Sequence, residues 1–176
     1  MSKITVKELE APTGFDLKIA AGETLDLKSQ GSVIMPTGSI LQVKQQVYPT
    51  FTQIANSSSH VDTGLTLAIT PTSTSSKILV TINVNLNTNN AGEQRINGIL
   101  VRDNTTIETF TNLLGLTASN PSVQVPIVYL DSPSTTSSIT YKLQVRGHSG
   151  STFRINNWYF TNGDATSTIT LMEVAG

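Results

Sequence analysis

The fold of this chain is decided by the segment Lys77-Ile78-Leu79-Val80-Thr81-Ile82-Asn83-Val84-Asn85-Leu86-Asn87. Every second residue, starting at Ile78, is aliphatic, and the residues between them are Thr or Asn apart from Leu79. Side chains alternate between the two faces of a β-strand, so this pattern predicts a strand with one buried face and one wet face. The face predicted to be solvated carries Asn83, Asn85 and Asn87.

Other stretches repeat this alternation, and runs of Ser, Thr, Asn, Asp and Gly separate them. Pro126 lies inside one of them and predicts an edge strand or a bulge, because proline cannot donate to a ladder. Eight or nine short strands with turns between them are typical of a β-sandwich or jelly roll, which we expect over residues 40–176. The further strands are expected at Gln42 to Ile54, Leu65 to Ile69, Gln94 to Arg102, Val123 to Tyr129, Ile139 to Val145, Thr152 to Asn156 and Ser167 to Val174.

The last of these strands differs from the others. In Thr168-Ile169-Thr170-Leu171-Met172-Glu173-Val174, apolar residues fall on both faces near the end. A strand buried on both sides is either central in the sandwich or has its second face against another subunit.

A glycine-punctuated repeat precedes the sandwich. Its four units are Gly14-Phe15-Asp16-Leu17-Lys18-Ile19, Gly22-Glu23-Thr24-Leu25-Asp26-Leu27, Gly31-Ser32-Val33-Ile34 and Gly38-Ser39-Ile40-Leu41-Gln42-Val43. Each unit places an aliphatic residue three positions after a glycine, as in a turn followed by a short strand. Such a strand is not stable alone, so residues 1–39 predict a β-stalk built by several chains. If the chain is a monomer, this segment is instead a docking arm. The residues expected between subunits are Leu17, Ile19, Leu25, Leu27, Leu41, Val43, Leu171 and Met172.

Composition limits the classes of function. The chain has 176 residues, a formal net charge of -1 and only 13 % charged residues, so no basic surface for nucleic acid is indicated. Ser and Thr make up about a quarter of the residues, which favours strands and turns. No apolar run is long enough to cross a membrane, the N-terminus lacks the apolar core of a secretory signal, and there is no cysteine.

Catalytic and metal-binding motifs are missing from the sequence. The two histidines, His60 and His148, lie in predicted loops, and no Gly-x-Ser-x-Gly elbow accompanies them. We expect both to be ordinary surface residues, and we expect neither enzymatic activity, nor a cofactor, nor a metal. The carboxylates Glu93, Asp103, Glu108, Asp131 and Asp164 are expected in or near loops as solvated charges.

One stretch near the end of the chain has the composition of a sugar-binding site. It reads Arg154-Ile155-Asn156-Asn157-Trp158-Tyr159-Phe160-Thr161-Asn162. An aromatic ring covers the apolar face of a sugar, and amide side chains reach its hydroxyls. The same cluster is also typical of a core or of a subunit interface, where aromatic residues are abundant. The residues proposed for receptor binding or for an interface are Arg154, Asn156, Asn157, Trp158 and Tyr159.

Three stretches resemble a recurrent domain of fibre and virion-structural proteins of tailed bacteriophages, particularly marine and cyanobacterial phages. They are Gly64-Leu65 with Ile69-Thr70-Pro71-Thr72-Ser73-Thr74-Ser75-Ser76-Lys77-Ile78-Leu79-Val80, then Tyr129-Leu130-Asp131-Ser132-Pro133-Ser134-Thr135-Thr136, and finally Ser167-Thr168-Ile169-Thr170-Leu171-Met172-Glu173-Val174. The resemblance covers roughly Gly38 to Gly176, and Met1 to Leu27 is similar to the N-terminal segments of such fibres.

The resemblance implies a virion component assembled in the host cytoplasm. It implies a homotrimer with a β-stalk and a jelly-roll head, attached to other virion proteins through its N-terminus and facing the host with its head. The leading hypothesis is that this head binds a glycan of the host cell surface. Two alternatives remain: an architectural capsid-decoration or tail-adaptor protein, and a glycan-degrading depolymerase.

Overall fold

The structure is a computed structural model. It describes residue 21 and residues 35–54, 57, 59–88, 94–116, 122–147, 152–158, 161–162 and 165–176. The chain divides into two units, Met1–Ile34 and Met35–Gly176, and all the described strands belong to the second. The predicted stalk contacts Leu17, Ile19, Leu25 and Leu27 lie outside the described residues, so the stalk stays a prediction.

The described part of the second unit contains strands and no helix, as predicted. The long strands are β1 (Ile40–Tyr48), β3 (Val61–Ile69), β4 (Lys77–Thr88), β5 (Gln94–Arg102), β6 (Thr105–Leu116), β7 (Ser122–Asp131), β8 (Ile139–Gly147) and β12 (Ser167–Val174). The short ones are β2 (Thr52–Ile54), β9 (Phe153–Ile155), β10 (Asn157–Trp158) and β11 (Thr161–Asn162). All pairings among them are antiparallel.

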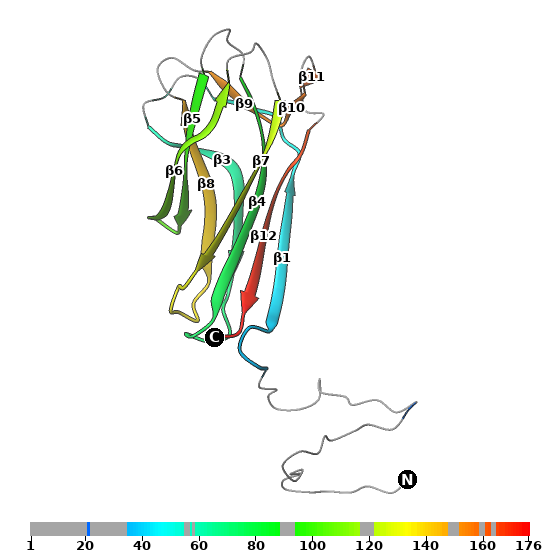
Figure 1. The fold of residues 1–176 in the computed structure, drawn as a ribbon, viewed down its shortest axis with the longest axis vertical. Coiled ribbons are helices and arrows are strands. Elements are labelled where there is room, and N and C mark those ends of the chain that lie inside the picture. Colours follow the sequence, from blue (N-terminus) through cyan, green and yellow to red (C-terminus); the bar gives the residue numbers. More distant parts are fainter. Residues whose placement is uncertain are drawn as a thin grey trace, which may run out of the picture. The chain divides into compact units, whose positions relative to one another are not determined.

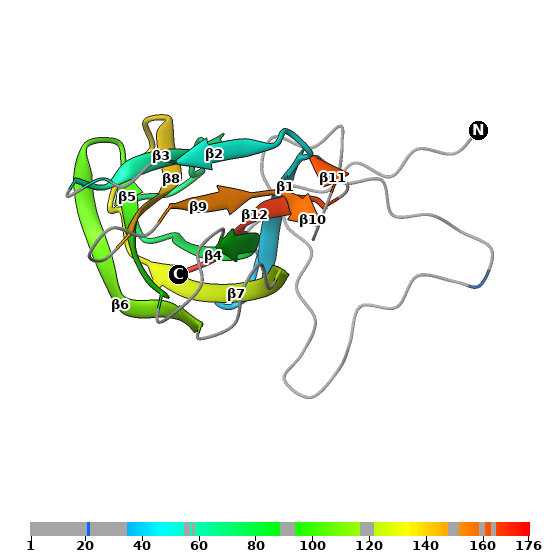
Figure 2. The same cartoon turned by 90° about the horizontal axis from the view of Figure 1, so that it is seen from above.

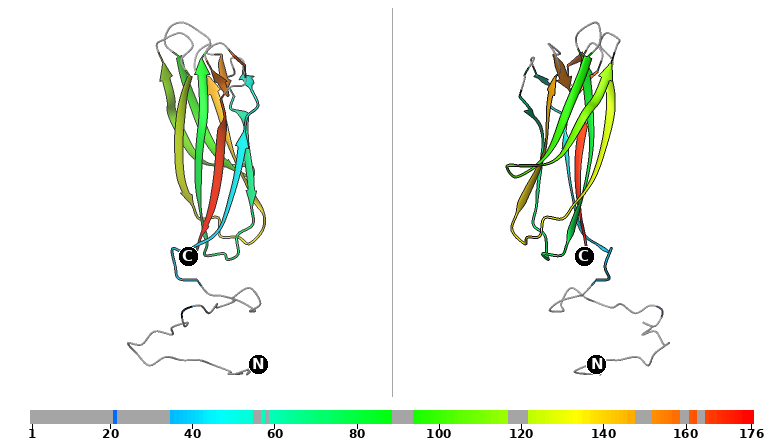
Figure 3. Two further views of the ribbon diagram at one scale, coloured as in Figure 1. Left: turned by 90° about the vertical axis from the view of Figure 1, so that its right-hand side faces the viewer. Right: turned by 60° about the vertical axis from the view of Figure 1, so that its left-hand side comes forward.

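The first sheet is built around β4. One edge of β4 pairs with β12, which pairs in turn with β1, while the other edge pairs with β7 (Figure 1). Where β12 no longer pairs with β4, the same edge of β4 pairs with β9 at Leu86 to Thr88. Strand β9 pairs in turn with β2. Figure 3 shows β12 in red beside β1 in cyan along most of its length.

The second sheet has the order β3-β8-β5-β6 and packs against the first. Figure 2 looks down the sandwich from the end that carries β9, β10 and β11. A single core lies between the two sheets, and both sheets contribute its largest fully buried side chains. The second sheet contributes Leu65, Ile69, Ile96, Leu100, Tyr141 and Leu143, and the first contributes Ile78, Ile82, Leu86, Phe153, Ile155 and Ile169. The predicted β-sandwich is therefore confirmed.

Alternation identified the buried faces correctly. The five aliphatic residues of β4 that start at Ile78 are fully buried, and every second residue of β8 from Ile139 onward is buried too. Burying such a side chain contributes about 1.5–3 kcal/mol. Pro126 lies on β7, which pairs with β4 alone among the described strands and so forms an edge, as predicted.

The last strand, β12, is central in its sheet. It pairs with β1 on one side and β4 on the other, and its inward residues, among them Ile169 and Leu171, are buried in the core. The central position is confirmed, and a contact of the outward face with another subunit stays a prediction. Its outward residues Met172 and Val174 are half-buried.

One long strand, β6, was not predicted. Its pairing with β5 is interrupted by two register shifts, and Asn112 adopts a positive φ of 55°, so its apolar residues do not keep a period of two. Glu108, which was expected in a loop, lies within this strand. Asp103 occupies the turn between β5 and β6, as expected of a loop carboxylate.

Candidate functional site

The stretch proposed for binding lies at one end of the sandwich, where β9 meets the end of β4 (Figure 1). Ile155 pairs with Leu86, and Asn156 and Asn157 follow directly. The opposite end of β4, at Lys77, pairs with Val174 of β12. The stretch is therefore separated from the last residues of β12 by nearly the full length of β4.

Asn156 is fully buried and joins three parts of the fold. Its amide nitrogen donates to the carbonyl oxygens of Tyr48 and Thr50, at 2.7 and 3.0 Å, and its Oδ1 accepts from the hydroxyl of Ser167 at 2.6 Å. Its φ of 56° places it in the left-handed region, where asparagine is among the better-tolerated residues. This side chain holds the β1–β2 turn and the start of β12 against β9.

Asn157 belongs to a second buried network, with Asn85 and Ser122. The backbone amide of Asn157 donates to Oδ1 of Asn85 at 3.2 Å, and the Nδ2 of Asn85 donates to the hydroxyl of Ser122 at 2.8 Å. That hydroxyl donates to the carbonyl of Asn157 at 2.9 Å. Each of the three residues therefore bonds to the other two.

These contacts correct the prediction of a solvated asparagine row on β4. Asn83 is exposed as expected, but Asn85 and Asn87 are buried. The chain that follows β9 reaches the outward face of β4 at this end, since the backbone amide of Asn157 donates to the side-chain oxygen of Asn85. Alternation assigns a residue to a face of the strand, but it does not show whether that face is covered.

Of the remaining residues of the binding stretch, the structure describes Arg154 in full and Trp158 by its backbone. Arg154 is half-buried on β9, and its Nε donates to Oε1 of Gln53 at 3.3 Å. The backbone of Trp158 pairs with Thr161 in the β10–β11 ladder, and its side chain lies outside the described residues, as does Tyr159. Of the five proposed binding residues, two are thus buried and hydrogen-bonded internally.

The residues proposed for a subunit interface have unlike positions in the sandwich. Val43 is exposed on β1, and Leu41 and Met172 are half-buried. Leu171 is fully buried in the core between the sheets, because it shares its face with Ile169. The core position of Leu171 leaves it no surface for a contact between subunits.

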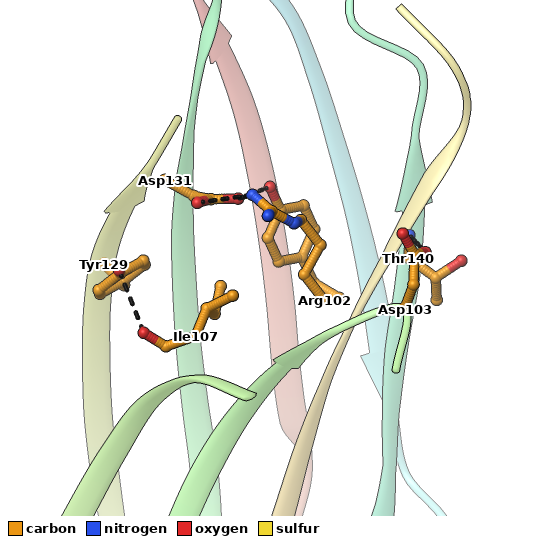
Figure 4. A network of polar contacts seen from close by, with 7 residues as sticks. Arg102, Asp103, Ile107, Tyr129, Asp131 and Thr140 are labelled. Atoms are coloured by element: carbon orange, nitrogen blue, oxygen red, sulfur yellow. Dashed lines mark hydrogen bonds and ion pairs between the residues drawn. The ribbon is translucent and has the colours of Figure 1, made fainter. Parts of the chain in front are cut away.

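Three titratable side chains meet between the two sheets. Arg102 of β5 donates through one nitrogen to both oxygens of Asp131 on β7, at 3.0 and 2.7 Å (Figure 4), and Tyr141 of β8 donates to Asp131 at 2.6 Å. Figure 4 also shows Tyr129, whose hydroxyl donates to the carbonyl of Ile107 at 3.3 Å. These bonds connect the first sheet to the second.

The environment of this cluster suits a structural role. Burial raises the pKa of Tyr141 far above its ordinary value, and the hydrogen bond and charge of Asp131 add to that rise. Burial acts to lower the pKa of Arg102, but its bond to Asp131 outweighs this, and the pKa is raised. The expectation that Asp131 is a solvated loop charge is wrong, because the residue is buried and paired.

Glu173 is a second buried carboxylate, and the sequence-based predictions did not include it. Its side chain lies in the core-facing series of β12 and accepts hydrogen bonds from Thr72 and Gln42. The alternation along the strand could have predicted this burial, since Glu173 lies an even number of residues from Ile169 and Leu171 and so shares their face. Arg102 likewise shares the parity of Leu100, so both charges could have been assigned to the interior.

A hollow of about 400 Å³ opens near a break in the pairing of β3 with β8. Gly64, with a φ of 89°, lies in the bulge between the paired residues Asp62 and Thr66. The lining residues are Asp62, Gly64, Leu65, Thr66, Asp103, Thr140 and Lys142. Asp62 is already bonded to Gln144 at 2.9 Å and lies 3.5 Å from the Lys142 ammonium, which leaves it only partly available to a ligand.

The described residues bring no metal site together. No group of three or more His, Asp or Glu side chains among them could hold an ion. His60 is half-buried, and burial together with the charge of Arg146 lowers its pKa, so the expectation of an ordinary surface histidine is met only in part. His148, Glu93 and Asp164 lie outside the described residues. Within the described ranges no helix has the length and apolarity that a membrane crossing needs.

Comparisons with known proteins give distant likenesses. No protein-family model and no curated protein matches the chain. A solved structure of the infectious bursal disease virus Gt strain is similar to 95 % of this chain and 47 % of its own, at 16 % identity and a TM-score of 0.44. The T13 particle of the same virus is similar over 88 % and 40 %, at 14 % identity and a TM-score of 0.45. A Bacillus endospore appendage pilus protein is similar over 82 % and 98 %, at 10 % identity and a TM-score of 0.32. The chain spans less than half the length of the viral chains that it matches.

Proposed function

We propose that the protein is a phage virion structural protein, a small homotrimeric fibre whose head binds the host cell surface through a glycan and whose N-terminal segment attaches to the particle. The sequence resemblance to phage fibre proteins and the β-sandwich head support this proposal. The observation that carries it is the separation between the entry of the chain into the head and the stretch proposed for binding.

The chain enters the sandwich at the end opposite to β9 and β10. There the backbone of Gly38 donates to the carbonyl of Ala175 at 2.8 Å, and Ala175 N donates to Ser39 O at 2.8 Å. Strand β4 runs from this end to the other over 12 residues, about 36 Å. A head held at this end therefore presents Arg154 and the backbone of Trp158 at the opposite end.

The chemistry of that end fits a weak, repeated contact. Arg154 keeps a partly exposed charge there, and the chain's only Trp, Trp158, follows it in β10. A homotrimer would carry three such sites, and linked weak sites can gain about 10² to 10⁴ in overall binding. A glycan-coated cell surface provides the matching array of repeated ligands.

The second candidate is a purely architectural decoration or adaptor protein of the virion. One observation favours it: the side-chain amide of Asn156 is buried and bonded within the head, and Asn157 is buried with its backbone amide bonded to Asn85. These groups then serve the fold rather than a ligand. In this case the main partner is another virion protein, which the N-terminal segment would join by adding strands.

Trp158→Ala separates the two candidates. The matched control is Thr136→Ala, an exposed loop position at the other end of the head. Loss of cell binding with intact incorporation into particles supports the fibre, whereas loss of incorporation supports the architectural protein. If Trp158→Ala changes neither, the stretch is not the functional surface. Release of reducing ends from host polysaccharide by the purified protein would instead support the depolymerase.

A further inference from the structure

The outward face of the first sheet is apolar near the end where the chain enters. Four of its aliphatic side chains are more than half exposed: Val43 at 56 %, Val47 at 53 %, Val128 at 65 % and Leu130 at 51 %. They come from β1 and β7, the edge strands of this part of the sheet among those described, and β12 and β4 lie between them. A set of exposed aliphatic residues on one face is more informative than scattered ones.

The strand register joins these residues into rows. Residues directly opposite each other in antiparallel strands share a face. One row crosses all four strands without a polar side chain: Val43, Met172, Leu79 and Leu130. The next two rows are Gln45, Thr170, Thr81 and Val128, then Val47, Thr168, Asn83 and Pro126. We call these three rows the apolar face, and none of their side chains is ionisable.

The two sides of β1 differ in polarity. Gln42, Lys44 and Gln46 lie on the side opposite Glu173, Leu171 and Ile169, and this side of β1 is only partly covered, since Lys44 is exposed. All three of these residues are polar. The outward side carries the exposed residues Val43 and Val47 beside Gln45.

The other sheet provides a comparison within the same molecule. The outward positions of β8 are Thr140, Lys142, Gln144 and Arg146, and its neighbour β3 contributes Asp62. That face carries charges of both signs, as a face in water does. The apolar face differs from it although both belong to one sandwich.

We propose that the apolar face packs against the apolar faces of the other copies of this chain, around the threefold axis of the proposed homotrimer. An uncharged face meets its own copy without like-charge repulsion, whereas a charged partner would find no complement on it. The free edges do not favour strand addition, because Pro126 cannot donate on β7 and Lys44 is exposed on β1. The inference rests on the proposed fibre and adds the surface through which its copies meet.

The size of the apolar face predicts the strength of the contact. Four strands span about 19 Å and three rows about 17 Å, on the order of 300 Å² in projection. A standard interface buries about 800 Å² per partner. Contact through this face alone is therefore weak, and the association of the protein should depend on its concentration.

The test is sedimentation velocity of the full chain over a range of protein concentrations, with the double variant Val43→Lys/Val128→Lys. We expect the wild type to sediment as a multiple of 18.8 kDa and the variant to have a dissociation constant raised at least about tenfold. High salt should recover part of the loss, since it screens the new charges. The control is Gln124→Lys, exposed on β7 two residues beyond the apolar face, and it should associate as the wild type does.

Two results would overturn the inference. One is a wild type that is monomeric at every concentration, and the other is a double variant that associates as tightly as the wild type. Equal thermal midpoints of variant and wild-type monomers exclude misfolding as the cause of any loss, and Leu130→Lys provides an independent repeat. None of these measurements uses cells or virus particles. The inference about the contact between copies can therefore fail independently of the proposed receptor binding and virion incorporation.

Discussion

The carboxylate of Glu173 accepts hydrogen bonds from both the backbone amide and the hydroxyl of Thr72, at 2.6 and 2.7 Å, although its side chain is fully buried. Gln42 Nε2 donates to the second oxygen at 2.6 Å. Burial by itself would raise the pKa of Glu173, but the hydrogen bonds from Gln42 and Thr72 outweigh it, and the pKa lies below its ordinary value of 4.5. The charged carboxylate therefore ties β1 and the β3–β4 turn to β12.

Acid should weaken the fold through this group. A pKa that is lower in the folded state means that the unfolded chain binds more protons around and below pH 4.5. The free energy of unfolding contributed by Glu173 is thus complete above this pH and is lost as the pH falls through the folded pKa. Denaturant unfolding between about pH 3 and pH 6 should show the loss.

Glu173→Gln is the matched control for this pH dependence. The amide keeps one acceptor oxygen but cannot serve all of the donors, so the variant should lose about 1–3 kcal/mol at neutral pH. Its free energy of unfolding should then vary less with pH than that of the wild type. If the two proteins have the same pH dependence, other carboxylates cause the acid sensitivity.

Tyr141→Phe should destabilise the sandwich by about 1–3 kcal/mol. The change removes a 2.6 Å hydrogen bond and leaves the buried Asp131 carboxylate with Arg102 as its remaining side-chain partner in the cluster. Chemical denaturation measures the loss. Arg102→Ala should cost more, about 3 kcal/mol, because it leaves Asp131 without its counter-charge. A neutral result for both variants would contradict a structural role for the cluster.

The parts of the fold that the sequence predicted are those encoded by neighbouring residues. The aliphatic residues of β4 recur at every second position, and a face of the strand follows from that spacing alone. The edge position of β7 followed from Pro126, since a missing donor is a local property. Strand β6 was not predicted, because its register shifts and the positive φ of Asn112 interrupt the period-two alternation of apolar residues.

The polar interior could not be predicted in the same way. Thr72 and Glu173 are 101 positions apart, and Arg102 meets Asp131 across the gap between the sheets. Which residue covers Asn85 depends on the path of the chain after β9, which no local pattern encodes. Such contacts require the strand order, and the sequence alone left that order open.

Gly64→Ala should be strongly destabilising. The backbone of Gly64 has a φ of 89°, which side-chain-bearing residues rarely adopt, and a Cβ there would overlap the ring of Tyr48. The backbone strain alone costs about 1 kcal/mol or more. The loss can be measured by thermal unfolding, with Gly115→Ala as the control, since a Cβ at Gly115 meets no neighbour. Equal stability of both variants would rule out the bulge geometry.

Asn156 allows a test that separates backbone strain from hydrogen bonding. Asn156→Gly retains the left-handed backbone and loses the side-chain bonds to Tyr48, Thr50 and Ser167, whereas Asn156→Ala loses the bonds and adds strain. Each should lower the free energy of unfolding by at least about 1–3 kcal/mol, and alanine should be worse than glycine by about 1 kcal/mol.

A double-mutant cycle with Ser167→Ala then isolates the 2.6 Å bond from the Ser167 hydroxyl to Asn156 Oδ1. We expect a coupling energy of about 0.5–3 kcal/mol between the two positions, because they are in direct contact. Additive effects would show that this bond does not hold β12 to β9. If instead Asn156→Gly leaves stability unchanged while abolishing cell binding, the amide serves the receptor rather than the fold.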